Sequence, residues 1–188
     1  MIKNPEIINR LKEGNEKYLT ALTGTEDISP AIREETTVNG QHPYAIIIAC
    51  SDSRVIPESI FSAGIGDLFV IRVAGNVIDS HQLGSIEYAA AHLHTNVIIV
   101  LGHTNCGAVS ATLEGDGDGN IRYITDQIKL AIGTEKNPYW AGCLNVKRGV
   151  SIIRQTLDEH HKISLDKLDV LGAMYDIKTG KVEWLDNL

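Results

Sequence analysis

Residues 44–54 read YAIIIACSDSR, and this stretch decides the fold that we predict. The run from 44 to 50 is apolar and rich in β-branched residues, which is typical of a short strand buried on both faces of a parallel sheet. The run ends at Cys50, and Asp52 and Arg54 follow within four residues. A protein core rarely holds charged residues such as these two without partners. Because ligands of open α/β sheets bind outside the carboxyl ends of the strands, we expect a functional site here.

A second apolar run, NVIIVLGH at 96–103, ends in the same manner. It is followed by TNCGA, so His103 closes the predicted strand and Cys106 comes three residues later. A turn that leads into a helix can direct both side chains at one point. We therefore expect the ends of the two strands to form a single site.

The rest of the chain alternates strand and helix patterns. The polar stretch 23–43 has glycine and proline and predicts a long arm rather than a packed element. Ser80 is a possible N-cap of its helix. The predicted helices are 5–19, 56–64, 80–95, one that begins near 106, and more than one within 121–161; the predicted strands are 44–50, 68–75, 96–103 and two within 168–186. This alternation is typical of an α/β domain with a mostly parallel sheet.

Composition narrows the class of protein. A chain of 188 residues is large enough for one domain with a core of its own. A net charge of −7 provides no basic surface for nucleic acid, and no apolar run has the roughly 20 residues of a membrane helix. The N-terminus shows no signal-peptide core, so we expect a cytoplasmic protein. Three cysteines in a reducing compartment favour metal binding or catalysis over disulfides.

Two thiols and one imidazole form a ligand set suited to zinc. Cys50, His103 and Cys106 would leave the fourth position of the metal open, as catalytic zinc sites do. The alternative is that Cys50 is a small buried hydrophobe, the usual role of a cysteine in an apolar strand. The joint pattern at two strand ends favours zinc. Cys143 has no such neighbours, and we interpret it as a core residue.

Asp52 and Arg54 would share one face of an extended backbone with Cys50. A guanidinium beside a carboxylate keeps it ionised and can hold it with two hydrogen bonds. The alternative is an ordinary surface ion pair, worth under roughly 1 kcal/mol. At the mouth of a zinc pocket the pair would instead orient water bound to the metal.

The motifs ACSDSRV and HTNCGA together resemble the paired Cys-x-Asp-x-Arg and His-x-x-Cys motifs of the β-class carbonic anhydrases. GDLFVIRVAGNVID, LGSIEYAAAHL and VLGAMYDIKTGKV are also similar to that family, and the resemblance covers roughly residues 38–183. It implies four parallel strands plus an antiparallel edge strand, flanked by helices. It further implies an N-terminal helix and arm at 1–37 and a zinc-binding α/β catalytic domain at 38–188.

The resemblance implies one zinc ion per chain, with Cys50, His103 and Cys106 as its ligands. Asp52 and Arg54 match the catalytic pair of the family. The implied reaction is the reversible hydration of carbon dioxide to bicarbonate and a proton, in which hydroxide on zinc attacks the carbon. The enzyme would be a carbonate dehydratase, which is a lyase.

The resemblance also implies substrate-binding residues. Gln41 matches a glutamine that hydrogen-bonds the substrate, and Gly107 matches a glycine that lets the substrate approach. Phe69 and Tyr88 match pocket walls that are partly lent across a dimer interface. Some members have tryptophan at the position of Ile47, together with a closed site, so we predict the open form, with Asp52 paired to Arg54.

The implied assembly is a homodimer or a dimer of dimers, with the active site near the interface and the N-terminal arm around a partner. Two other functions stay open. The same scaffold could hydrolyse a related heterocumulene such as carbon disulfide or carbonyl sulfide, with the substrate chosen by tunnel shape. The chain could also be a zinc- or bicarbonate-binding protein with little turnover.

Overall fold

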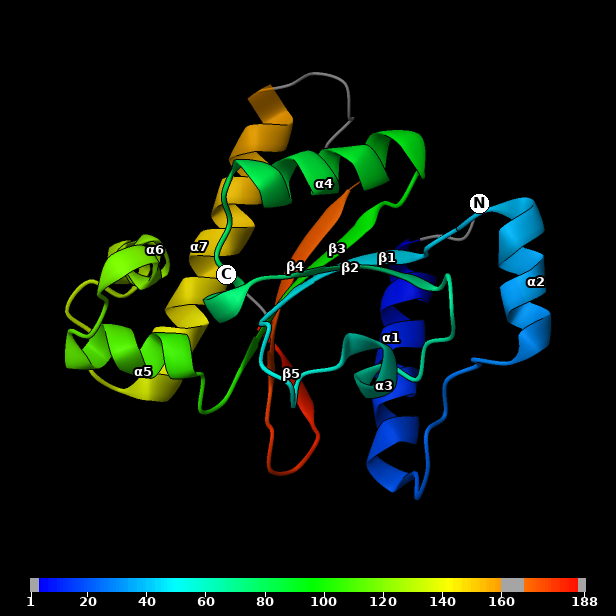
Figure 1. The fold of residues 1–188 in the computed structure, drawn as a ribbon, viewed down its shortest axis with the longest axis horizontal. Helices are drawn as coiled ribbons and strands as arrows, with labels where there is room; N and C mark the ends of the chain where they lie inside the picture. Colours follow the sequence, from blue (N-terminus) through cyan, green and yellow to red (C-terminus); the bar gives the residue numbers. More distant parts are fainter. Residues whose placement is uncertain (1–3, 160–167, 186–188) are drawn as a thin grey trace.

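The centre of the molecule is one five-stranded sheet (Figure 1). The structure is a computed structural model that describes residues 4–159 and 168–185. Strand order is β2-β1-β3-β4-β5; the first four strands are parallel and β5 is antiparallel to β4. The strands are β1 (Ala45–Ala49), β2 (Leu68–Arg72), β3 (Val97–His103), β4 (Asp169–Tyr175) and β5 (Val182–Trp184). The predicted fold class is confirmed.

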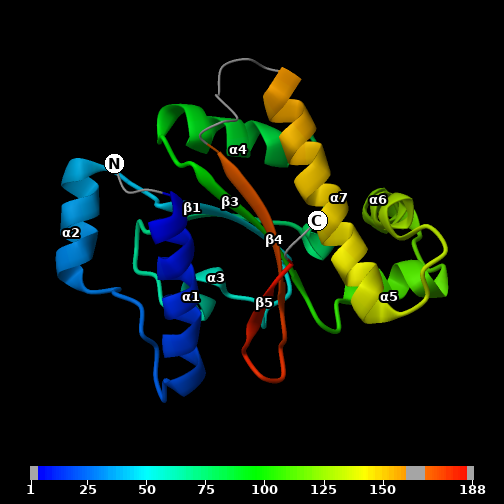
Figure 2. The same ribbon diagram turned by 180° about the vertical axis from the view of Figure 1, so that it is seen from behind.

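Helices cover both faces of this sheet (Figures 1 and 2). α1 and α3 lie on one face, and α4 and α7 lie on the other, with α5 and α6 packed beside α7. The helices are α1 (Asn4–Thr20), α2 (Pro30–Asn39), α3 (Pro57–Ile60), α4 (Ser80–His92), α5 (Gly107–Glu114), α6 (Arg122–Ile132) and α7 (Pro138–Glu159), with short 3-10 turns η1 (Ala74–Asn76) and η2 (Gly119–Ile121). Within the described ranges, no helix is long and apolar enough to cross a membrane.

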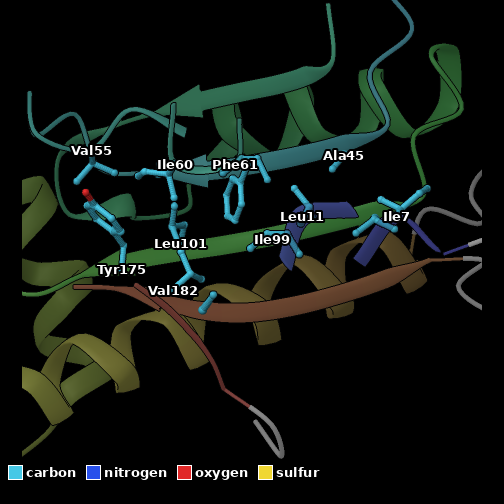
Figure 3. Close-up of a cluster of buried hydrophobic side chains, with 14 of the residues drawn as sticks. Ile7, Leu11, Ala45, Val55, Ile60, Phe61, Ile99, Leu101, Tyr175 and Val182 are labelled. Carbon is cyan, nitrogen blue, oxygen red and sulfur yellow. The ribbon is translucent and has the colours of Figure 1, made fainter. Parts of the chain in front are cut away.

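The sheet is apolar on both faces, which explains the continuous apolar runs in the sequence. In β1, Ile47 packs into the cluster on the α1 side, whereas Ile46 and Ile48 pack into the cluster on the α4 and α7 side. Figure 3 shows the first cluster, in which Ile7 and Leu11 of α1 lie against the sheet. Two buried faces hold β1 rigidly, so the residue that follows it has a fixed position.

Two sequence predictions were wrong in detail. The arm contains a helix, α2, which begins with Pro30 and is capped by the Ser29 side chain, an acceptor for the N–H of Ile32. No residue of α2 is buried, and for that reason its sequence lacks an apolar periodicity. The N-cap of α4 is Asp79 rather than Ser80, because the Asp79 carboxylate accepts the N–H of His81 in a capping box. Residues 160–161 of the predicted helical region lie outside the described residues.

Candidate metal centre

The carboxyl ends of β1 and β3 bring three metal-binding side chains together. Cys50 follows β1 and His103 is the last residue of β3, its neighbour in the sheet. Cys106 is the N-cap of α5. The two sulfur atoms and the imidazole nitrogen all lie within 4.8 Å of one another, and all three residues are buried. The sequence prediction of one site at two strand ends therefore agrees with the geometry.

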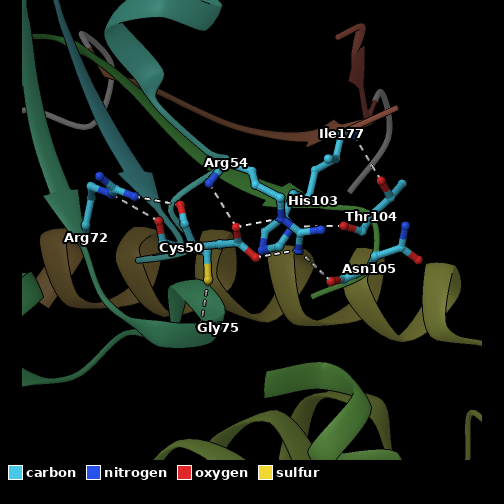
Figure 4. A network of polar contacts seen from close by, with 9 residues as sticks. Cys50, Arg54, Arg72, Gly75, His103, Thr104, Asn105 and Ile177 are labelled. Carbon is cyan, nitrogen blue, oxygen red and sulfur yellow. Dashed lines mark hydrogen bonds and ion pairs between the residues drawn. The ribbon is translucent and has the colours of Figure 1, made fainter. Parts of the chain in front are cut away.

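The imidazole of His103 has an unused nitrogen. Its Nδ1 lies 2.9 Å from the carbonyl oxygen of Thr104, to which it donates when the proton is on Nδ1 (Figure 4). Nε2 is buried and has no hydrogen-bond partner among the described residues. A buried lone pair of this kind, oriented by a hydrogen bond on the other ring nitrogen, is the usual arrangement of a histidine that binds a metal. The site therefore fits zinc.

The sulfur atoms of the two thiols lie within 4.8 Å of each other. Hydrogen-bond donation from the Cys106 thiol, and to a lesser degree the nearby His103 side chain, favours the thiolate of Cys50 and so lowers the pKa of Cys50. The N–H of Gly75 also donates to Sγ of Cys50 at 3.3 Å (Figure 4). Hydrogen-bond donors therefore lie around Sγ of Cys50, and the thiolate that they favour is the form of cysteine that binds a metal.

Asp52 and Arg54 form the predicted ion pair. Nε and Nη2 of Arg54 donate to the two carboxylate oxygens of Asp52 at 2.9 and 2.7 Å. The backbone N–H of Arg54 adds a third bond at 3.0 Å. These bonds from Arg54 hold the pKa of Asp52 well below its usual range. The carboxylate does not join the group of three metal-binding atoms.

The predicted substrate-binding residues lie in two places. Gly107 begins α5 next to Cys106, and a Cβ atom at this position would meet nothing within 4 Å. Gln41 is exposed and precedes β1, so it lies at the opposite end of the strand from Cys50. Phe69 lies early in β2, with its ring centroid 6.3 Å from that of the half-exposed Tyr88 on α4. A single chain brings Gly107 to the metal centre but not Gln41.

Three residues that sequence reasoning missed support the site. Arg72 ends β2 and donates to the carbonyl oxygens of Cys50 and Asp52 at 3.1 and 2.7 Å. Gly75 adopts φ +66°, and Nδ2 of Asn145 donates to its carbonyl oxygen at 2.7 Å. The glycine that ends the predicted strand 68–75 was a usable signal for Gly75. Asn145 has no local signal, since only the packing of α7 brings it there.

Comparison with known proteins identifies relatives over most of the chain. The family model described as carbonic anhydrase matches residues 45–182. Carbonic anhydrase 2 of Mycobacterium tuberculosis is 46% identical over 121 residues, which cover 63% of this chain and 58% of that protein. A carbonic anhydrase of Mycolicibacterium smegmatis is 43% identical, over 95% of this chain and 91% of its own.

Solved structures with the same fold carry similar descriptions. The β-carbonic anhydrase CafA of Aspergillus fumigatus superposes with a TM-score of 0.73 at 29% identity, over 84% of this chain and 81% of its own. A tetrameric β-carbonic anhydrase of Sordaria macrospora has a TM-score of 0.68 at 26% identity, over 97% and 95% of the two chains.

Proposed function

This chain belongs to the β-class carbonic anhydrases, and on that premise we propose that it catalyses the reversible hydration of carbon dioxide to bicarbonate and a proton. The observation that carries the proposal is the convergence of Cys50, His103 and Cys106 on one buried point. Three ligands and an adjacent ionised carboxylate are the parts that hydration at a metal requires.

The metal in this proposal is one zinc ion per chain, held by Sγ of Cys50, Nε2 of His103 and Sγ of Cys106. When bound, zinc supplies a Lewis acid that makes water a nucleophile near neutral pH. The unpartnered Nε2 of His103 and the grouping of the three ligand atoms within 4.8 Å of one another support this assignment.

Asp52 has the role of orienting the attacking water in this proposal. One of its oxygens accepts a hydrogen bond from that water and so directs a lone pair at the carbon of the substrate. Arg54 keeps the carboxylate ionised and holds it apart from the three metal-binding atoms. This pairing supports the open form of the site. The presence of isoleucine rather than tryptophan at position 47, which is fully buried in the sheet, supports it as well.

Access for the substrate comes beside Gly107 in this proposal. Because a Cβ atom there would meet nothing within 4 Å, the backbone faces open space next to Cys106. Carbon dioxide is small and apolar, so a short approach lined by backbone and aliphatic groups is sufficient for binding it.

The active unit is a homodimer or a dimer of dimers in this proposal. Gln41, Phe69 and Tyr88 would reach the metal centre of a partner chain. The place of Gln41 at the end of β1 opposite Cys50 supports this, as do the exposure of Gln41 and Tyr88 and the place of β2 at the edge of the sheet. α2, with no buried residue, would contact the partner as part of the arm 1–37. The cytoplasmic location and the boundary between the arm and 38–188 stay predictions.

Stopped-flow hydration of carbon dioxide by protein of measured zinc content tests the proposal. We expect about one zinc per chain and rapid hydration. If the zinc-loaded protein consumes carbon disulfide rapidly and hydrates carbon dioxide slowly, the proposed substrate would be carbon disulfide instead of carbon dioxide. Zinc without either activity would make the chain a binding protein.

A further inference from the structure

A small polar cavity lies behind the metal centre, between η1, α6 and α7. Its polar lining consists of Asn76, Gln127, Asn145 and Arg148, with no acidic residue among the lining residues. The space open to the centre of a water-sized sphere is about 10 Å³. That is room for a single small occupant.

Two hydrogen-bond donors at this cavity have no partner. Nδ2 of Asn76 and Nε of Arg148 are both buried and make no hydrogen bond within residues 4–159 and 168–185. Asn76 is 3% exposed, so water at the surface does not satisfy its amide. Arg148 takes part in none of the ion pairs of these residues. Unpaired buried donors are destabilising, and more so when one is charged, so the cavity needs an acceptor.

The backbone holds Asn76 at the cavity in an uncommon conformation. Its φ is +44°, a region that side chains other than glycine seldom adopt, and Gly75 before it has φ +66°. Nδ2 of Asn145 donates to the carbonyl oxygen of Gly75 and so fixes this turn to α7. Asparagine adopts this left-handed region more readily than most residues, so the turn holds Asn76 in place without large strain.

We propose that this cavity binds one monoatomic anion of the chloride class, which accepts hydrogen bonds from Nδ2 of Asn76 and Nε of Arg148. An anion satisfies both donors and offsets the guanidinium charge with no acidic neighbour. Water would satisfy the donors but would bring no negative charge to the half-buried guanidinium of Arg148. The anion also supports the turn from which the N–H of Gly75 donates to Cys50, so it stabilises the wall of the metal centre.

Crystals of the zinc-loaded protein grown with sodium bromide test the location. We expect an anomalous bromide peak between Nδ2 of Asn76 and Nε of Arg148. A peak without anomalous signal at this point would identify water and overturn the proposal, as would bromide found elsewhere only.

Thermal unfolding tests the energetics, with chloride compared to gluconate at equal ionic strength. For the wild type we expect the midpoint to rise by roughly 3–6 °C when chloride exceeds its dissociation constant about tenfold. Arg148→Met should lose the rise, while Lys147→Met, which removes a neighbouring exposed charge, should keep it. An equal rise in Arg148→Met would place the anion elsewhere, including at zinc, and contradict the proposal.

Asn76→Asp provides a second variant should Arg148→Met not fold. Aspartate tolerates the left-handed conformation and puts a carboxylate opposite Arg148, where it would replace the anion. We expect a midpoint in gluconate at least as high as that of the wild type and no further rise with chloride. A full chloride response in this variant would overturn the proposal.

Discussion

The two ends of the parallel sheet differ in how complete they are. At the carboxyl end, Cys50, His103 and Cys106 are buried, and the Asp52–Arg54 pair is held by three hydrogen bonds. At the amino end, Gln41 is exposed and precedes β1. One chain therefore builds the metal centre, whereas the residues expected to complete the pocket face outward. The difference indicates that metal binding and substrate binding will respond differently to substitution.

The largest effect is expected from Cys106→Ser at the carboxyl end. Loss of a thiolate ligand should reduce zinc affinity by more than the roughly 10–100-fold that follows the loss of an outer partner of a ligand. Hydration should fall with it, as measured by metal analysis and stopped-flow kinetics. Cys143→Ala is the control, because that thiol is buried away from the three ligands and should keep its zinc. Equal zinc in both variants would contradict the ligand assignment.

Asp52→Asn should separate turnover from metal binding at the same end. The amide keeps the shape of the carboxylate but loses its charge, so we expect zinc retention and a fall in kcat of roughly 10²–10⁴-fold. Asp126→Asn changes an exposed residue in a long ion pair at 3.7 Å and should leave kcat unchanged. An unaltered kcat in Asp52→Asn would remove Asp52 from the mechanism.

Gln41→Ala tests whether the amino end serves a partner chain. We expect full zinc content and a fall in kcat/KM of roughly 10-fold, the size of one lost hydrogen bond to the substrate. When Gln41→Ala chains are dissociated and reassembled with Asp52→Asn chains, the mixture should regain activity. In each hybrid dimer, the metal centre of the Gln41→Ala chain is intact and meets the intact Gln41 of the Asp52→Asn chain. Random mixing would restore about one quarter of the sites. Activity no higher than the mean of the two parents would show that Gln41 does not act across an interface.

The smallest effects should distinguish two glycines at the carboxyl end. A Cβ atom on Gly75 would lie 2.8 Å from Cδ1 of Ile128 at φ +66°, so Gly75→Ala should reduce the free energy of unfolding by about 1–3 kcal/mol. Gly107→Ala meets no neighbour and should change it by no more than about 0.5 kcal/mol. Denaturant titration measures both. If the substrate approaches beside Gly107, only Gly107→Ala should lower kcat/KM at unchanged stability.

Local sequence determined the elements that deliver the metal centre. Continuous apolar runs are sufficient to predict buried parallel strands, and each functional residue of the carboxyl end closes such a run or lies within four residues after it. Cys50, Asp52 and Arg54 lie within five positions, so their proximity is a matter of chain geometry. α2 escaped prediction for the opposite reason, since a helix with no buried face has no apolar periodicity.

Tertiary structure decided what lies between the elements. The hydrogen bond from Asn145 to Gly75 joins residues 70 positions apart, and the cavity beside Asn76 forms where α6 and α7 lie next to η1. Neither residue has a pattern that reports such a contact, because side-chain hydrogen bonds depend on the packing of whole helices. The same holds for Gln41: its sequence distance from Cys50 is short, but a rigid strand places the two at opposite ends of the sheet. A sequence records which groups are available, and packing determines which of them meet.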